Sequence, residues 1–367
     1  MPAEEYQKNK ILSAAKQKIS NVNNLRVVAI TGSFGKTSTK DILYTLLWKK
    51  YKVVKTPKSF NTPLGISQTI LEDVKENTDI FIAEVGAYKK GEIAKIAKLI
   101  RPKIAIITAI APQHLEKFGS IKNIAQAKFE LVEGLDKTGI AVINKNFLSF
   151  LPISKTPKNT VFYGTWDSMF SASDIKVSID GTNFTMTTPG GDVQIKMPLI
   201  GAHHVSNFLA AAGAAFELGL SASEIAQRAL KLLPTPHRLE VVRKNGFTLI
   251  DNSFNTNLES SKSSFGLLDS LPGSVKIVIT PGLIEMGERA KDANKEFIKL
   301  AANVANKIII IGSKNKSYLL EGLSDIHFPK DKIELADNTK SALFTVSENI
   351  EKDALVLLEN DLPDQYQ

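Results

Sequence analysis

The feature that most restricts the fold is the stretch 27–38, where an apolar run passes through a glycine-bracketed turn into an amphipathic segment. Its sequence is Val-Val-Ala-Ile-Thr-Gly-Ser-Phe-Gly-Lys-Thr-Ser. This order predicts a buried strand, a loop and a helix. Glycines let several backbone N–H groups point inward, and the N-terminal end of a helix adds a positive dipole. The stretch therefore predicts a phosphate-binding loop at the end of a strand.

Two residues of this loop carry the expected chemistry. Lys36 would lie against the β- and γ-phosphates of a nucleotide, and the Thr37 hydroxyl would bind Mg²⁺. Only two residues separate Gly32 from Gly35, whereas the general phosphate-loop pattern has four between its glycines. An ordinary glycine turn that caps a helix is the alternative. We favour nucleotide binding, because the strand, Gly-Lys-Thr and the helix occur together.

Apolar strand-like runs alternate with helical periodicity along most of the chain, which predicts an α/β protein with mostly parallel sheets. The Pro-Thr-Pro sequence at 234–236 is the best domain boundary. We expect a helical leader at 1–24, a central phosphate-loop domain at 25–236 and a smaller Rossmann-like C-terminal domain at 237–367. Short alternating runs between residues 159 and 200 predict a small antiparallel β excursion within the central domain. The expected strands are 25–31, 52–55, 80–84, 104–108 and 140–144 in the central sheet, 160–163, 175–179, 184–188 and 193–197 in the excursion, and 247–251, 275–280, 307–311 and 354–358 in the C-terminal sheet.

Composition narrows the class of protein. Hydrophobic residues make up 43% of the chain and charged residues 23%, as in an ordinary globular protein. The chain has no cysteine, which excludes disulfides, zinc fingers and a thiol nucleophile. Its net charge is +8, but the lysines are scattered, so we expect a solvated surface or attraction of anionic substrates and no nucleic-acid partner. An acidic N-terminus and the lack of an apolar run of about 18 residues make the cytoplasm the expected compartment.

Polar residues follow several of the expected strands. Ligands of open α/β sheets bind beyond the carboxyl ends of strands, so these residues are candidates for a site. Glu84 ends one strand and could bind Mg²⁺ beside the phosphates, with a helix-capping acid as the alternative. His114 follows the next strand and could equally be a ligand or a satisfied loop histidine. Lys128 lies on the following helix, where the pattern alone predicts a surface lysine.

A set of short motifs, taken in order, resembles the Mur ligase family of ATP-dependent enzymes that form amide bonds. The closest branch is the one that adds D-alanyl-D-alanine in peptidoglycan synthesis. The short loop with two residues between its glycines also matches this family's form. Each motif alone is weak, but the ordered set is specific. The motifs are 31–38, 60–65, 83–87, 91–93, 114–120, 127–131, 201–207, 237–240, 251–257 and 281–288.

The resemblance implies a mechanism in which ATP phosphorylates a substrate carboxylate and an amine then attacks the acyl phosphate, leaving ADP and phosphate. Lys36 would stabilise the γ-phosphoryl group, and Lys128 matches the lysine that these enzymes carbamylate with CO₂. Asn61, His204 and His237 match motif positions and receive only supporting roles. Catalytic roles fall to Lys36, Glu84, His114 and Lys128. Two Mg²⁺ ions would be held by Thr37, Glu84, His114 and Lys128. ATP would be bound by Gly32, Ser33, Phe34, Gly35, Lys36, Thr37, Ser38 and Asn207, which contacts adenine, and by Arg238 and Asp251, which reach ATP from the C-terminal domain as a cleft closes.

The implied substrates are a muramoyl-peptide carboxylate and D-alanyl-D-alanine or a similar amine. The family's usual N-terminal domain, which grips a uridine nucleotide, has no counterpart in residues 1–24. The precursor could therefore be a small molecule or lipid-linked, with a membrane-associated partner in place of that domain. Two other functions stay open, a folylpolyglutamate-synthase-like ligase and a non-catalytic nucleotide-binding subunit. The complete set of charged site residues favours an enzyme.

Overall fold

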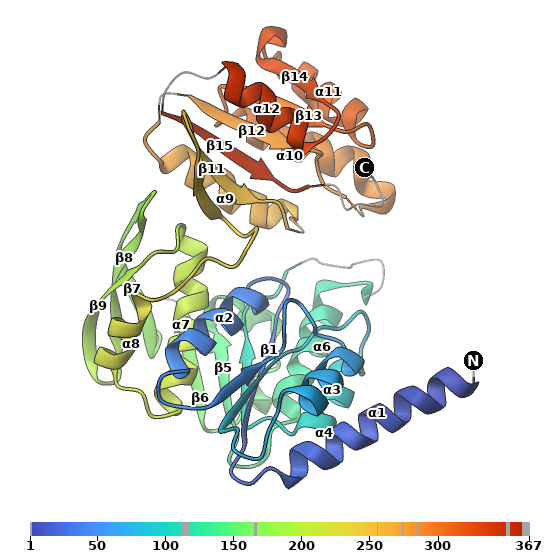
Figure 1. Ribbon diagram of the computed structural model, residues 1–367, viewed down its shortest axis with the longest axis vertical. Coiled ribbons are helices and arrows are strands. Elements are labelled where there is room, and N and C mark those ends of the chain that lie inside the picture. The colour runs from blue at the N-terminus through green and yellow to red at the C-terminus, as the bar shows by residue number, and fades with distance from the viewer. Residues whose placement is uncertain are drawn as a thin grey trace. The chain divides into compact units, whose positions relative to one another are not determined.

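The computed structural model describes residues 2–111, 118–164, 167–254, 256–273, 275–284, 286–349 and 353–361. The chain divides into two compact units (Figure 1). Unit 1 comprises the described residues of Met1–Lys176, Asn183–Pro198 and His203–Leu233. Unit 2 comprises those of Val177–Thr182, Leu199–Ala202 and Pro234–Gln367. The second unit thus takes in two short segments that precede the Pro-Thr-Pro sequence.

Unit 1 is organised around a sheet whose described strands run in the order β2-β3-β1-β4-β5-β6-β7-β8-β9. Neighbouring strands from β2 to β7 pair in parallel, with β1 between β3 and β4. Two-residue turns join β7 to β8 and β8 to β9, and such short connections allow only antiparallel pairing. The strands are β1 (Arg26–Thr31), β2 (Val53–Lys55), β3 (Ile80–Glu84), β4 (Ile104–Ile107), β5 (Ile140–Asn144), β6 (Thr160–Gly164), β7 (Phe170–Ser178), β8 (Gly181–Thr188) and β9 (Gly191–Met197).

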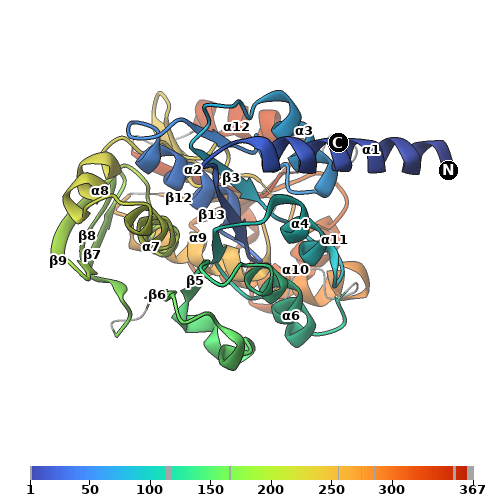
Figure 2. The same cartoon turned by 90° about the horizontal axis from the view of Figure 1, so that it is seen from below.

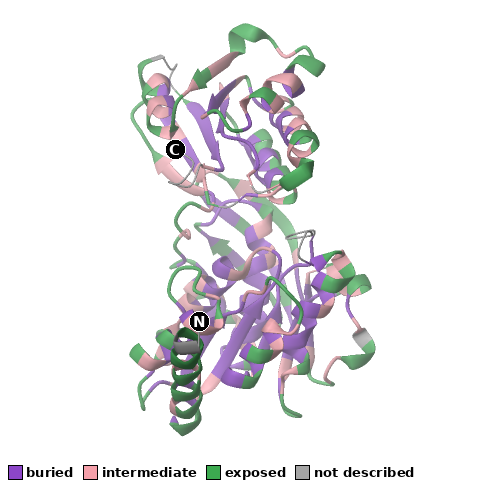
Figure 3. Ribbon diagram, turned by 90° about the vertical axis from the view of Figure 1, so that its right-hand side faces the viewer, coloured by how far each residue is buried: buried purple, intermediate pink, exposed green. Residues whose placement is uncertain are grey.

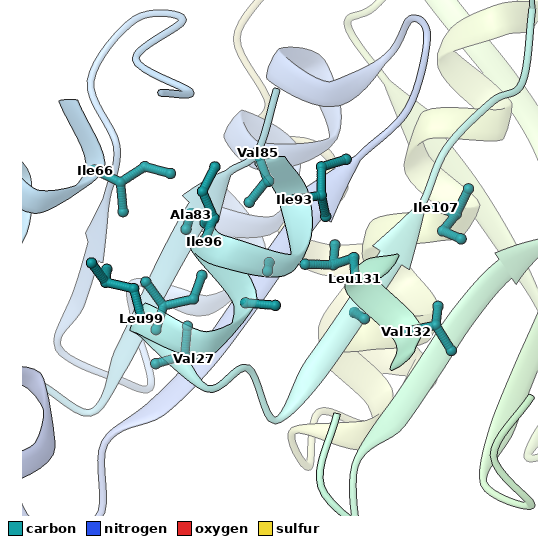
Figure 4. Close-up of a cluster of buried hydrophobic side chains, with 14 of the residues drawn as sticks. Val27, Ile66, Ala83, Val85, Ile93, Ile96, Leu99, Ile107, Leu131 and Val132 are labelled. Atoms are coloured by element: carbon teal, nitrogen blue, oxygen red, sulfur yellow. The ribbon is translucent and has the colours of Figure 1, made fainter. Parts of the chain in front are cut away.

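Helices cover both faces of this sheet (Figure 2). One face carries α1 (Pro2–Asn21), α3 (Pro63–Glu72), α4 (Glu92–Ile100) and α6 (Ile121–Glu133), whose apolar side chains form one buried cluster with β1, β3, β4 and β5 (Figure 4). The other face carries α2 (Lys36–Leu47), α7 (Ala202–Glu217) and α8 (Ala222–Ala229). Two 3₁₀ turns, η1 (Lys145–Phe150) and η2 (Ile153–Lys155), follow β5.

Burial on both faces explains why the central strands are almost continuously apolar. Residues Val27–Thr31 of β1 and all of β3 are buried, and Figure 3 shows these strands in purple beneath helices with exposed outer surfaces. Parallel pairing places Ile30 of β1 opposite Glu84 of β3. The carboxyl ends of β1 and β3 therefore lie side by side, which brings Glu84 next to the loop that follows β1.

Unit 2 contains a second sheet, in the order β10-β11-β15-β12-β13-β14. All its described neighbours pair in parallel except β10 and β11, which are antiparallel. Apolar clusters lie on both faces of the sheet. The elements are β10 (Glu240–Arg243), β11 (Phe247–Asn252), α9 (Leu258–Ser270), β12 (Lys276–Thr280), η3 (Gly287–Arg289), α10 (Ala290–Ala302), β13 (Lys307–Ile311), α11 (Lys316–Asp325), η4 (Lys330–Lys332), β14 (Ile333–Ala336), α12 (Thr339–Asn349) and β15 (Ala354–Glu359).

The predicted fold class is confirmed, with a phosphate-loop parallel sheet and a second, smaller wound sheet. One strand assignment is wrong. The sequence pattern places the run 160–163 in the antiparallel excursion, but β6 pairs in parallel with β5, with Thr160 opposite Ala141. The antiparallel part begins only at the hairpin of β7 and β8. The pattern does not predict the short strands β10 and β14, because their mixed burial leaves no continuous apolar run.

No helix in the described ranges has both the length and the apolar character needed to cross a bilayer.

A buried acid lies at the end of β15, a central strand of the sheet in unit 2. Glu359 is fully buried, and one of its carboxyl oxygens, Oε2, accepts a hydrogen bond from Asn252 Nδ2 at 2.8 Å. Burial raises the pKa of Glu359 to about 7, although hydrogen bonds from Asn252, Ser264 and Ser261 oppose this shift. The folded protein therefore holds a proton there at pH values where the unfolded chain does not.

This shift predicts a pH dependence of stability. The folded pKa of about 7 lies above the usual value of 4.5, so the folded state binds more protons between these values and stability falls as pH rises through that window. Glu359→Gln should remove this loss, which amounts to about 3 kcal/mol because one pKa unit corresponds to about 1.4 kcal/mol. Urea unfolding at pH 5 and pH 8 measures it. We expect the variant to gain stability over the natural protein only at pH 8, while the exposed control Glu348→Gln changes nothing. Equal pH dependence of the natural protein and Glu359→Gln would contradict the account.

Candidate functional site

The loop between β1 and α2 is fastened to the end of β4. The Thr108 hydroxyl donates a hydrogen bond to the carbonyl oxygen of Phe34 at 2.5 Å. The Ser33 hydroxyl donates to the carbonyl oxygen of Ala111 and accepts from its N–H, both at 3.0 Å. The Ser33 N–H itself donates to the carbonyl oxygen of Ala109 at 2.8 Å. These bonds fix the loop at the carboxyl edge of the sheet.

The N-terminal end of α2 opens onto this loop. The helix begins at Lys36, and its N-cap Gly35 has a φ of 80° and offers no side-chain cap. The first N–H groups of a helix have no partner within the helix, and its dipole makes that end positive. The Lys36 ammonium donates to the carbonyl oxygen of Gly32 at 2.8 Å. Thr37 and Ser38 are buried in the first turn. This arrangement suits an anion held by backbone N–H groups and one lysine.

Both glycines of the loop lie against close neighbours. A Cβ atom built on Gly32 would lie 1.9 Å from Thr108 Oγ1. A Cβ atom on Gly35 would lie 2.3 Å from Oδ1 of Asn207, so the Asn207 carboxamide of α7 stands directly against the loop. Asn207 itself is 8% exposed. The structure thus brings Asn207 beside the phosphate loop from a position far along the chain.

Glu84 lies beside the same helix. Its side chain is 1% exposed, and its Oε2 accepts a hydrogen bond from the Lys40 ammonium at 3.1 Å. Its other oxygen, Oε1, accepts from Asn61 Nδ2 at 3.3 Å. Lys40 is not among the residues that the sequence pattern predicts for the site. The available signal was a lysine three residues after Thr37, on the face of the helix that the sheet buries.

Lys128 is a buried residue of α6. The residue is only 7% exposed, so the prediction of a surface lysine, which the pattern alone gave, is wrong. Burial, and secondly the charge of Lys36, hold the pKa of the Lys128 ammonium well below its ordinary value. The two lysines therefore lie close enough to repel each other. The lowered pKa shifts Lys128 toward its neutral amine form compared with an exposed lysine.

Three other candidate residues do not belong to the described part of this edge of unit 1. Within unit 2, His237 Nδ1 lies 2.8 Å from Oδ2 of Asp251, and the Arg238 guanidinium stacks 4.7 Å from the centre of the Phe254 ring. The residues that flank Arg238 have positive φ angles, 63° at His237 and 51° at Leu239, a strained geometry that is common at functional sites. His114 lies outside the described residues. Unit 1 therefore gathers the loop 32–38, Glu84, Lys128 and Asn207, and unit 2 holds Arg238 and Asp251.

The close approach at Gly35 predicts a selective loss of ligand binding. Gly91 is a matched control, because it is also an N-cap with a positive φ of 89°, but a Cβ atom added there would meet nothing within 4 Å. Gly91→Ala should cost about 1–2 kcal/mol of unfolding free energy through backbone strain alone. Gly35→Ala should cost more, displace Asn207 and weaken binding of a fluorescent ADP analogue at least about tenfold. Equal ADP affinities of the two variants in a fluorescence titration would contradict this geometry.

Comparison with known proteins identifies the family. Residues 30–215 match the model of the Mur ligase middle domain. A UDP-N-acetylmuramoyl-tripeptide–D-alanyl-D-alanine ligase of Bacillus subtilis is 31% identical over 340 residues, which cover 91% of this chain and 72% of the relative. The MurF ligase of Thermotoga maritima, solved in complex with ADP, has a TM-score of 0.85 at 25% identity, covering 96% of this chain and 80% of that one. A folylpolyglutamate synthase of Mycobacterium tuberculosis shares the fold, with a TM-score of 0.71 at 15% identity over 96% of this chain and 92% of that one. The chain therefore belongs to the Mur ligase family, as the order of its motifs predicted.

Proposed function

We propose that this chain is an ATP-dependent, ADP-forming ligase that joins D-alanyl-D-alanine to the carboxylate of a muramoyl tripeptide during synthesis of peptidoglycan precursors. The name of the Bacillus subtilis relative supplies this pair of substrates, and the Thermotoga maritima relative holds ADP. The observation that carries the proposal is the gathering of the loop 32–38, Glu84, Lys128 and Asn207 at one edge of a sheet. We expect the reaction in the cytoplasm.

The chemistry requires positioning and charge neutralisation more than a covalent side chain. A carboxylate oxygen of the tripeptide attacks the γ-phosphorus of ATP, the bond to the β–γ bridging oxygen breaks, and ADP leaves. The amino group of the dipeptide then attacks the acyl carbon, phosphate leaves, and one proton is released. Lys36 and the uncapped end of α2 supply positive charge to the phosphoryl oxygens. Asn207 is proposed to contact adenine, and Arg238 and Asp251 to bind ATP from residues 237–367.

The donor set fits magnesium. Thr37 and Glu84 offer the hydroxyl and carboxylate oxygens that Mg²⁺ prefers, and both are buried beside the loop. We assign them to a first ion, and His114 and Lys128 to a second. When bound, Mg²⁺ would neutralise phosphate charge. We also propose two domains, a central ATP-binding one at 25–236 and a C-terminal one at 237–367.

Lys128 is proposed to carry a carbamate. The neutral amine is the form that attacks CO₂, and burial favours that form here. A bond forms between the amine nitrogen and the carbon of CO₂, and one proton is released. The side chain then ends in an anionic carbamate, which can bind a metal cation. The modification would also remove the repulsion between Lys128 and Lys36.

A turnover assay tests the reaction. The chain is incubated with ATP, Mg²⁺, UDP-N-acetylmuramoyl tripeptide and D-alanyl-D-alanine, and the amide product is followed by mass spectrometry together with released phosphate. Lys36→Ala should lower turnover about a thousandfold, which corresponds to about 4 kcal/mol of transition-state stabilisation. Lys55→Ala is the control, because Lys55 is a partly exposed residue of β2 that pairs with Asp41 of α2. It should leave turnover within about twofold.

The same assay with other substrates separates the alternative functions. A lipid-linked muramoyl tripeptide replaces the UDP-linked one to test a membrane-bound precursor. Glutamate with a folate replaces both substrates to test a folylpolyglutamate-synthase-like ligase. No amide from any muramoyl peptide would contradict the proposed substrates. ATP binding combined with unchanged function of Lys36→Ala in cells would instead favour a non-catalytic nucleotide-binding subunit.

Carbamylation has its own test. With ¹³C-bicarbonate present, the protein should give a carbamate carbon signal in its ¹³C NMR spectrum, and the signal should strengthen as pH rises because more Lys128 is neutral. Lys128→Met should abolish it, while Lys122→Met, an exposed lysine of the same helix α6, should not. A carbamate signal that survives Lys128→Met would place the modification on another lysine.

A further inference from the structure

Lys40 is a buried cation to which the proposed reaction gives no role. Its side chain is 1% exposed, and its ammonium contacts two acceptors, Glu84 Oε2 at 3.1 Å and the carbonyl oxygen of Lys58. Lysines are almost never fully buried unless they are paired, because removing the charge from water is costly. A lysine in this position therefore has a specific partner, and that partner is the carboxylate assigned to magnesium.

Lys40 is placed by the helix that carries the phosphate loop. It lies three residues after Thr37, so both side chains project from one face of α2. Strand β3 ends beside β1, with Glu84 opposite Ile30. The contact between Lys40 and Glu84 thus ties the end of β3 to the first turns of α2, on the side where Thr37 lies.

The segment that follows β2 contacts both Lys40 and Glu84. Its residue Lys58 accepts a hydrogen bond from Lys40, and its residue Asn61 donates to Glu84 Oε1 at the longer distance of 3.3 Å. The Glu84 N–H donates to Thr56 Oγ1 at 3.0 Å. The carboxylate is therefore held firmly through Oε2 by a charged donor and loosely through Oε1 by a neutral one.

We propose that Lys40 is a positioning residue that fixes Glu84 through Oε2, so that Oε1 stays available to Mg²⁺ beside Thr37. This inference rests on the proposed function, in which Glu84 binds magnesium. The ammonium holds the carboxylate in one orientation and balances its charge when no metal is bound. Without Lys40, the carboxylate loses its anchor and Mg²⁺ must order it at the moment of binding.

Magnesium-dependent nucleotide binding tests the role without turnover. A fluorescent ADP analogue is titrated at increasing Mg²⁺. Lys40→Met should raise the Mg²⁺ concentration for half-maximal enhancement at least about tenfold, while ADP affinity without Mg²⁺ stays within about twofold. Lys55→Met is the matched control, since Lys55 also pairs with an acid of α2 but at a partly exposed position. It should behave as the natural protein.

The outcomes separate this inference from the proposed function. Glu84→Gln should abolish the magnesium effect on ADP binding. If the natural protein shows a magnesium effect, Glu84→Gln loses it and Lys40→Met keeps it within about twofold, the positioning role is overturned and the proposed function stands. If the natural protein shows no magnesium effect, the positioning role is overturned together with the assignment of Glu84 to magnesium, and the turnover assay decides the proposed reaction separately.

Chemical rescue distinguishes the ammonium from a general need for bulk. Because the chain has no cysteine, Lys40→Cys introduces a unique thiol. In denaturant, 2-bromoethylamine alkylates it with loss of bromide, giving a thioether side chain that ends in an ammonium; iodoacetamide gives a neutral one. After refolding, the aminoethylated protein should regain the natural magnesium dependence, and the neutral adduct should not. The natural protein, treated identically, controls for refolding. Equal behaviour of the two adducts would overturn the role of the charge.

Unfolding without metal completes the test should Lys40→Met fold poorly. Each single variant, Lys40→Met or Glu84→Gln, leaves one buried charge without its oppositely charged partner and should lower the denaturation midpoint. The double variant should recover most of that loss, because neither charge remains. Strictly additive losses would show that the two side chains are not coupled and would overturn the inference.

Discussion

The parallel pairing of β1 with β3 and β4 is the constraint on which the rest of the site depends. Since parallel strands end at the same edge, this pairing sets Glu84 beside the loop that follows β1 and gives that loop an anchor in Thr108. The loop then orients the N-terminal end of α2. Helices α6 and α7, which cover opposite faces of the sheet, add Lys128 and Asn207 at the same edge.

Several charged side chains gather at this edge of the sheet. Burial, and secondly the charge of Lys36, lower the pKa of Lys128, and Glu84 pairs with Lys40. Lys36 and the uncapped end of α2 place positive charge at this edge. We propose that this charge stabilises a bound polyphosphate, in a reaction in which negative charge moves between phosphate and carboxylate oxygens.

Local patterns predicted the glycine loop between β1 and α2 and the position of Glu84 at the end of β3, since each strand and the residues that follow it are adjacent in sequence. The other features of the site depend on long-range contacts, which a local sequence pattern does not reveal. The burial of Lys128 depends on packing that its own helix pattern does not reveal, and Lys40 finds its partner 44 residues away. β6 alternates between buried and half-buried residues, which resembles an antiparallel strand, and only its pairing with β5 makes it parallel. The family resemblance supplied roles for Lys128 and Asn207 that the residue pattern alone could not.

The most direct measurement is a crystal structure of the chain with a non-hydrolysable ATP analogue and Mg²⁺. We expect the phosphates to lie over the loop 32–38 at the N-terminal end of α2. The Lys36 ammonium should exchange the carbonyl oxygen of Gly32 for a phosphate oxygen, and a magnesium ion should lie between Thr37 and Glu84. Phosphates bound elsewhere, with the contact between Lys36 and Gly32 intact and no metal at Glu84, would contradict it.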